Sequence, residues 1–163
     1  MATTMTDMSL PAVLTPALPT RDAIKDALYR FLTGMDTNDA ALFDSAFTAD
    51  AKWALNRRDL DGLEAIHADC YDTVISQLDT THYATNIRID VGDDEKTATL
   101  SALYQAQHYR GGRGKVGGAT SFVTGGQYWM TLVKEEESGL WKIKVFKMRS
   151  IWSEGDVTIM GHD

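Results

Sequence analysis

The chain has 163 residues, 44% of them hydrophobic and 24% charged, as in a single globular domain. This composition excludes a disordered chain, a collagen-like repeat and a disulfide-stapled scaffold. The net charge of −7 disfavours binding to the negative phosphates of nucleic acids. The single cysteine, Cys70, cannot form an internal disulfide, and the first 20 residues lack the basic start of a secretory signal. We therefore expect a cytoplasmic protein that binds neither nucleic acid nor membrane.

The first half of the chain has the apolar spacing of helices. Residues 1–19 are rich in Thr, Met, Ala and Pro, and we expect them to form a flexible tail or an arm over a neighbour. An apolar stripe at three- and four-residue intervals then predicts a helix that Gly34 ends close to Asp36. Two more helices are predicted over residues 38–47 and 61–78, the second opened by a capping box.

The second half of the chain alternates between apolar and polar residues, as strands do. A short strand is predicted near residues 51–55, and long strands over residues 82–91, 96–109, 121–134 and 140–152. Helices followed by antiparallel strands indicate an α+β domain over residues 20–156, with a curved sheet wrapped on the helices. Residues 157–163 are expected to form a C-terminal tail.

A glycine-rich segment, residues 111–118, contains the letters of a dinucleotide-binding motif. That motif needs a helix after it, whereas the residues that follow have the pattern of a strand. The segment is therefore predicted to be a long hairpin loop, or a mobile lid at a pocket mouth. The four histidines and Cys70 do not have zinc-ligand spacing, and we expect no metal and no cofactor. On residue counts alone, a triad of two histidines and one carboxylate for a non-haem metal stays open.

Three polar residues are the candidates for catalysis: Asp36, His82 and His108. His108 shares one face of its predicted strand with small apolar residues, so it should point inward. Each candidate also has a structural interpretation: Asp36 as a turn residue or helix cap, His82 as a surface residue, His108 as a hydrogen-bonded core residue. If the two imidazoles and the carboxylate met in one apolar cavity, they could transfer protons near neutral pH.

Four segments, in their order and spacing, resemble the SnoaL-like, scytalone dehydratase-like branch of the NTF2-like superfamily: residues 29–39, 81–83, 107–109 and 149–156. The resemblance implies a cone-shaped α+β barrel, with three N-terminal helices packed on a strongly curved antiparallel sheet around one deep pocket. It also implies that Asp36, His82 and His108 form the acid–base centre.

The chain departs from the scytalone dehydratase pattern around this centre. Water-holding tyrosines of that pattern are replaced by Met35 and Trp53, and a serine and an asparagine by Gly126 and Tyr128. We therefore expect a substrate other than scytalone. The expected substrate-binding residues, several of them donors for a substrate oxygen, are Tyr29, Met35, Trp53, Tyr104, Tyr128 and Arg149. Arg149 is in phase with inward residues of its strand, although an outward salt bridge is the alternative.

The resemblance implies a cofactor-independent dehydratase, a carbon–oxygen lyase that acts on a hydrophobic polycyclic or aromatic small molecule in secondary metabolism or in steroid or polyketide transformation. His82 would be the main base and acid, and His108, held by Asp36, would position it or protonate the departing hydroxyl. Two near-neutral histidines would give a bell-shaped pH profile.

The sequence is also compatible with other functions. An isomerase or cyclase could use the same residues, and the fold also suits a non-catalytic ligand-binding or assembly module or the small subunit of a ring-hydroxylating oxygenase. An apolar outer sheet face that includes Trp129 and Trp152 predicts a homodimer or homotrimer.

Overall fold

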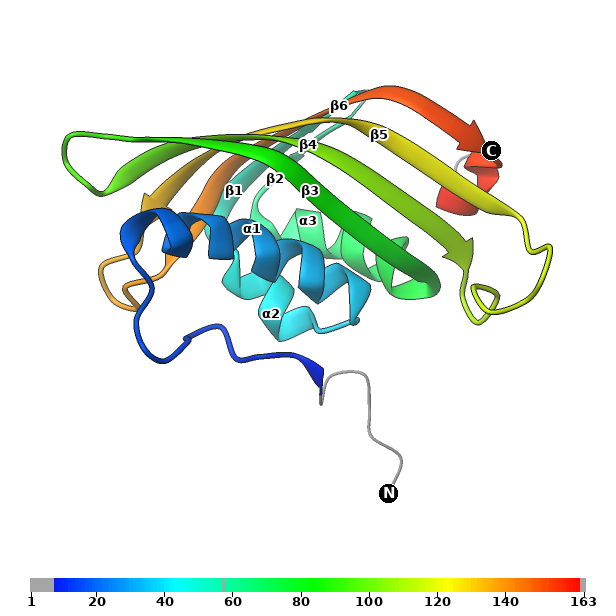
Figure 1. Cartoon of the computed structure of the whole chain (residues 1–163), viewed down its shortest axis with the longest axis horizontal. Coiled ribbons are helices and arrows are strands. Elements are labelled where there is room, and N and C mark those ends of the chain that lie inside the picture. The colour runs from blue at the N-terminus through cyan, green and yellow to red at the C-terminus, as the bar shows by residue number, and fades with distance from the viewer. Residues whose placement is uncertain (1–7, 57, 162–163) are drawn as a thin grey trace.

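The computed structural model describes residues 8–56 and 58–161, in which six strands form one curved sheet over a layer of helices (Figure 1). The strand order is β2-β1-β6-β5-β4-β3. The strands are β1 (Phe47–Leu55), β2 (Arg58–Asp61), β3 (Leu78–Val91), β4 (Thr97–Arg110), β5 (Ser121–Lys134) and β6 (Trp141–Gly155). The expected α+β architecture is confirmed, with helices on the concave face of the sheet (Figure 1).

The sheet is mixed, which corrects the expectation of a wholly antiparallel one. β3, β4, β5 and β6 follow one another as antiparallel hairpins, and β1 pairs with β2 in the same way. β6 then lies beside β1 and runs parallel to it. Parallel neighbours need a long connection, and here most of the domain lies between them. The sheet is open, with β2 and β3 as its edges.

The first two helices pack closely because of a glycine. α1 (Thr20–Asp36) continues beyond Gly34 and includes Asp36 in its last turn, so the expected helix end at Gly34 is wrong. A Cβ atom at Gly34 would lie 2.5 Å from the backbone nitrogen of Phe43 in α2 (Ala40–Ser45). Gly34 therefore permits the contact between α1 and α2 rather than ending α1.

The predicted third helix is divided into short pieces. β2 occupies its expected start, and Gly62 rather than a capping box precedes α3 (Leu63–Ile66). A π-helical turn, η2 (His67–Asp72), and a 3₁₀ turn, η3 (Ile75–Gln77), follow. The buried residues Ile66 and Tyr71 are five positions apart, and the wider π-helical turn brings both to the core side.

Aromatic side chains fill the space between α1 and the sheet. Phe31 of α1 packs edge-on against four rings at centroid distances of 5.2–5.8 Å: Phe43, Phe47, Trp53 and Phe146. Such pairs contribute about 0.5–1.5 kcal/mol each beyond the burial of their area. Because these rings come from α1, α2, β1 and β6, they hold the helices and the first part of the sheet in one core.

A buried arginine fastens α1 to its neighbours. Arg30 is 3% exposed and donates to the Asp26 carboxylate at 2.8 Å, to the Ser45 carbonyl, and to the Trp141 carbonyl at 2.6 Å. Burial lowers the pKa of Arg30, and the neighbouring Asp26 opposes that change. Every contact satisfies a donor of the guanidinium, so the charge is tolerated inside the core.

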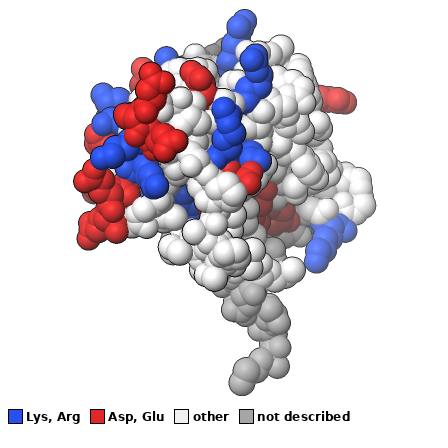
Figure 2. Space-filling view, turned by 60° about the vertical axis from the view of Figure 1, so that its left-hand side comes forward, with Lys and Arg blue, Asp and Glu red and all other residues white. Residues whose placement is uncertain are grey.

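The end of the sheet that carries the β3–β4 and β5–β6 turns has charges of both signs. Figure 2 brings this end forward and shows acidic and basic side chains next to one another. Lys96 pairs with Glu136 at 2.8 Å and so joins the β3–β4 turn to the β5–β6 turn, while Lys142 pairs with Glu135 at 2.8 Å within the β5–β6 hairpin. In the described part of the chain, no helix has the length and apolar character needed to cross a membrane.

The two ends of the chain differ in how they pack. Residues 8–19 have no long helix or strand and run below the helix layer (Figure 1), where Ser9 hydrogen-bonds Thr37 at 3.1 Å. After β6 the chain forms a 3₁₀ turn, η4 (Val157–Met160), which buries Ile159. Residues 1–7, 162 and 163, parts of the two expected tails, lie outside the described residues.

Candidate active site

The carboxylate of Asp36 joins the end of α1 to β3. Its Oδ1 atom accepts from Thr80 Oγ1 at 2.8 Å and from His82 Nδ1 at 2.7 Å, while Oδ2 accepts from the His82 backbone N–H at 2.7 Å. A carboxylate in the last turn of a helix is disfavoured by the helix dipole, and these three donors offset that cost. The side chains of His82 and Asp36 are 6% and 20% exposed, respectively.

Strand register brings the two candidate histidines together. His82 of β3 lies opposite Ala106 of β4, and His108 lies opposite Thr80, so the two imidazoles are diagonal neighbours on the inner face. Their ring centroids are 5.3 Å apart with an interplanar angle of 85°. The small side chain of Ala106 leaves room for the His82 ring. Residues 36, 82 and 108, far apart in the sequence, therefore form one cluster.

Hydrogen bonds determine the tautomers of both rings. The carboxylate of Asp36 accepts from His82 Nδ1, and the Phe122 carbonyl, which can only accept, lies 3.1 Å from His108 Nδ1. Both Nδ1 atoms therefore carry a proton, and in the neutral rings Nε2 has the lone pair. Across the described residues, no hydrogen bond to either Nε2 is found. Both atoms are thus available as proton acceptors.

His108 is a neutral imidazole at physiological pH. Burial, and next the charge of His82, lower the pKa of His108 from 6.5 to about 4. This corrects two expectations: Asp36 pairs with His82 rather than holding His108, and His108 does not titrate near neutrality. A bell-shaped pH profile from two near-neutral histidines is therefore no longer expected.

Two stacked tyrosines lie on the same inner face of the sheet. The rings of Tyr104 and Tyr128 are parallel within 2°, with centroids 4.2 Å apart, and both residues are buried. Burial raises the pKa of Tyr128 well above its ordinary value, with further contributions from Tyr104 and from the negative charge of Asp36. The Tyr128 hydroxyl therefore stays protonated at neutral pH and can donate a hydrogen bond.

Met35 and Trp53 lie in the aromatic core. They are 5% and 3% exposed, and the Trp53 ring contacts Phe31 at 5.4 Å and Phe146 at 5.1 Å between centroids. The buried Nε1–H of Trp53 has no acceptor among the described residues. Their expected role in substrate binding stays a prediction.

Tyr29 and Arg149 do not join the cluster. Tyr29 is 46% exposed on the outer side of α1, and Arg149 is also exposed. The register of β6 shifts by one residue at Lys144, so the inner face changes from Ile143 to Phe146 along the strand. The bulge turns Arg149 outward, which corrects the inward orientation expected from alternation.

Two hollows lie beside the sheet, and each borders a residue described above: Thr80 lines the first and Tyr104 the second. One of about 160 Å³ lies beside the glycine loop, whose Gly112 and Gly114 N–H groups donate to Asp79 at 3.1 and 2.8 Å. Another, of about 420 Å³, is lined by Tyr83, Thr85, Tyr104, Gln105 and Trp152. Asp36, His82 and His108 line neither hollow, so neither is the deep pocket that the resemblance implied. The lid role of the loop stays a prediction.

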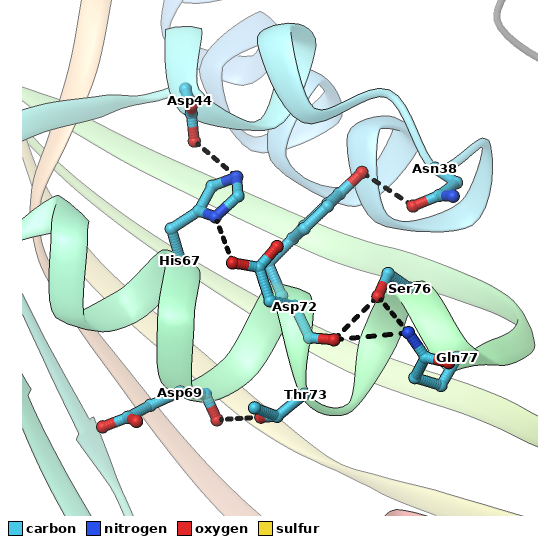
Figure 3. A network of polar contacts seen from close by, with 9 residues as sticks. Asn38, Asp44, His67, Asp69, Asp72, Thr73, Ser76 and Gln77 are labelled. Carbon is cyan, nitrogen blue, oxygen red and sulfur yellow. Dashed lines mark hydrogen bonds and ion pairs between the residues drawn. The ribbon is translucent and has the colours of Figure 1, made fainter.

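A second histidine–carboxylate group lies in the helix layer (Figure 3). His67 Nδ1 is 3.1 Å from Asp72 Oδ2, and its Nε2 is 3.7 Å from Asp44 Oδ1. The adjacent Tyr71 donates to Asn38 Oδ1 at 3.0 Å. These contacts fasten η2 to α2 and to the turn after α1. Within the described ranges, no group of three or more His, Cys, Asp or Glu residues is arranged to hold a metal ion.

Two participants in the site were missed in the sequence: Thr80 and the Phe122 carbonyl. Thr80 is two residues before His82, so alternation along β3 places both side chains on one face and would have identified it. The Phe122 carbonyl belongs to the backbone, and only the register of β4 with β5 brings it to His108. His162, the fourth histidine of the chain, lies outside the described residues.

Comparison with known proteins identifies the family of this chain. Residues 16–147 match the SnoaL-like domain family. The "Terrestric acid biosynthesis cluster protein E" of Penicillium crustosum is 44% identical over 153 residues, which cover 94% of this chain and 97% of that protein.

Solved structures show the same fold at low identity. A putative scytalone dehydratase from Novosphingobium aromaticivorans has a TM-score of 0.71 and 22% identity, covering 83% of this chain and 87% of its own. A type 2 hexachlorocyclohexane dehydrochlorinase has a TM-score of 0.69 and 20% identity, covering 85% and 89%. The chain belongs to the SnoaL-like domain family, and its fold is that of the NTF2-like superfamily.

Proposed function

We propose that this protein is an enzyme of secondary metabolism that removes water from a hydrophobic, polycyclic or aromatic β-hydroxy carbonyl compound. The relative from Penicillium crustosum, 44% identical, bears the name of a biosynthetic cluster, which supports the metabolic setting. The observation that carries the proposal is the His82 ring, held by Asp36 at 2.7 Å through Nδ1 and in edge contact with His108.

His82 acts as base and then as acid. Its Nε2 lone pair takes the proton from the carbon next to the substrate carbonyl, and the C–H electron pair moves to form an enolate. Asp36 stabilises the resulting imidazolium and holds its orientation. When the enolate re-forms the carbonyl, the bond from the β-carbon to the hydroxyl breaks, and the imidazolium gives its proton to the departing oxygen. Water leaves, and both side chains return to their first state.

His108 and Tyr128 assist without exchanging their own protons. Neutral His108 accepts a hydrogen bond from the substrate hydroxyl at Nε2, because its Nδ1 proton is engaged with the Phe122 carbonyl. Tyr128, whose pKa is raised by burial, donates to the carbonyl oxygen on which negative charge develops. Because the cluster lies at a largely buried end of α1, the same charges interact more strongly than they would in water.

Proton removal is tested apart from water loss by two readouts on the same incubation. Purified protein is incubated in D₂O with a panel of cyclic ketones that carry a β-hydroxyl, and NMR follows exchange of the acidic C–H while mass spectrometry follows the products. We expect exchange together with a product lighter by the mass of one water. His82→Gln should abolish both, and His67→Gln, which alters a histidine–carboxylate pair outside the cluster, should leave both unchanged.

The alternatives give different results in the same assay. Exchange with a product that keeps the substrate's composition, apart from the incorporated deuterium, indicates an isomerase or cyclase that uses the same residues. Saturable binding of the ketones without exchange indicates a ligand-binding module. Exchange that persists in His82→Gln contradicts the proposed role of His82.

A further inference from the structure

We propose that Thr80 is a positioning residue of this site, which holds Asp36 in the orientation that the His82 ring requires. The inference rests on the proposed function, because it assigns a role in the same proton transfer. It starts from one contact: Thr80 Oγ1 donates to Asp36 Oδ1 at 2.8 Å, the same oxygen that His82 Nδ1 contacts at 2.7 Å.

The carboxylate has two kinds of contact with β3. The His82 backbone N–H holds Oδ2, and this bond depends only on the strand being present. Oδ1 is held by two side chains, Thr80 and His82. When the His82 ring moves toward substrate, Thr80 keeps Oδ1 in place, while the His82 backbone N–H keeps Oδ2. The hydroxyl therefore fixes rotation of the carboxylate about its last bond, and with it the direction of the imidazole.

Thr80 also lies next to the second histidine of the cluster. It lies opposite His108 in the β3–β4 register, on the inner face, between the Asp36 carboxylate and the second imidazole. Side chains of directly opposed residues are about 4.5–5.5 Å apart at Cβ. A β-branched residue is held in few rotamers on a strand, so its hydroxyl is already directed at Asp36 before substrate binds.

The neighbouring threonine is a built-in control. Thr81 is exposed, and alternation along β3 directs its side chain to the face opposite that of Thr80 and Asp36. Thr80→Val removes the hydroxyl and keeps the branched shape. Thr80→Ser restores a hydroxyl without the methyl group. Thr81→Val makes the same chemical change on the opposite face of the strand.

The first measurement needs no substrate. Histidine-selective NMR of the whole protein follows the Nδ1 proton that His82 shares with Asp36, assigned by its loss in His82→Gln. We expect Thr80→Val to shift this resonance and to speed its exchange with water, while Thr80→Ser and Thr81→Val keep the wild-type signal. An unchanged resonance in Thr80→Val overturns the inference, whatever reaction the protein catalyses.

The second measurement is kinetic, with a substrate found by the exchange assay. Loss of one hydrogen bond to a charged group should lower kcat about 10- to 100-fold in Thr80→Val. KM should stay near the wild-type value, because Thr80 does not touch substrate, and Thr80→Ser should recover most of kcat. An altered resonance with an unchanged kcat overturns the positioning role. If the wild-type protein exchanges no substrate proton, the proposed function fails, while the NMR result still decides the Thr80 contact.

Discussion

His82 is bound to Asp36 through two separate atoms, its ring Nδ1 and its backbone nitrogen, each 2.7 Å from a carboxylate oxygen. The ring, the strand and the end of α1 are therefore joined at one carboxylate. A change in the packing of α1 against β3 would move the ring directly. The geometry of the Asp36–His82 pair thus depends on how the helices pack against the sheet.

Asp36→Asn and His82→Gln should each reduce the rate of proton abstraction on the order of 10²- to 10⁴-fold, because a positioned general base contributes that much. Asp36→Asn leaves the imidazole without a negative partner, and His82→Gln removes the base. Initial rates of C–H exchange measure the effect, and circular dichroism confirms folding.

The matched control for this prediction is His67→Gln. His67 also has a carboxylate partner, Asp72 at 3.1 Å, but belongs to the helix-layer network of Figure 3. An equal loss of rate in His67→Gln would point to general destabilisation instead of catalysis.

His108 should make the protein less stable in mild acid. Burial, and then the charge of His82, lower the pKa of His108 to about 4, whereas in the unfolded chain it titrates at about 6.5. Between these values the unfolded state binds more protons than the folded state. The stability associated with His108 is therefore complete above pH 6.5 and is lost as the pH falls toward 4. From this residue alone we expect a loss of about 2 kcal/mol between pH 7.5 and pH 5.

Urea unfolding at these two pH values tests the effect of His108. The variant His108→Gln has no imidazole to protonate, so its free energy of unfolding should change less over the same range. Carboxylates are common to both proteins, and the difference between the two slopes isolates the histidine. Parallel slopes in wild type and His108→Gln would rule out this account.

Arg30→Met should destabilise the fold by about 3 kcal/mol, because it leaves Asp26 and the carbonyls of Ser45 and Trp141 without their donor. Chemical denaturation measures the change. Arg21→Met is the comparison, since Arg21 lies on the same helix and donates to the Ile89 carbonyl at 2.8 Å in an exposed position. Its loss should cost less than about 1 kcal/mol. If both variants lost a similar free energy of unfolding, burial of Arg30 would add nothing to stability.

The outer face of the sheet should mediate self-association. Tyr83, Ile151 and Trp152 are 57%, 59% and 48% exposed there, and the residues lining the 420 Å³ hollow are uncharged. The Trp152 ring lies flat on the strand because a Cβ atom at Gly125 would be 2.2 Å from its Cζ2 atom. The uncharged lining of this hollow suits a second copy of the chain, because contact there would remove exposed aromatic surface from water.

Trp152→Glu should therefore convert an oligomer into a monomer, as measured by size-exclusion chromatography with light scattering. Tyr29→Glu places the same charge on an exposed aromatic position of the helix layer and should leave the oligomer intact. A wild-type protein that is monomeric at tens of micromolar would refute the prediction. Trp129, also expected in the contact, is 38% exposed with the Lys147 ammonium 4.7 Å from its ring centroid.

Local patterns in the sequence identified most of the elements, and the family resemblance singled out Asp36, His82 and His108, which the structure brings together. The alternation Ala98 to His108 correctly placed His108 on the inner face, because alternation is a property of a single strand. The same reasoning failed for Arg149, since one extra residue in β6 reverses the faces beyond it. Another local signal, the glycine as a helix stop, misplaced the end of α1. Gly34 lies inside the helix, where the lack of a side chain permits close contact with Phe43.

The sequence by itself determined the helix-then-strand order, the inward face of each regular strand and the three residue types able to move a proton. Only the tertiary structure decided that Asp36 pairs with His82, that His108 stays neutral, and that Thr80 shares the carboxylate. These outcomes depend on cross-strand register, on burial and on the packing of α1 against β3. Each joins residues distant along the chain, and a local pattern has no information on which distant atoms become neighbours.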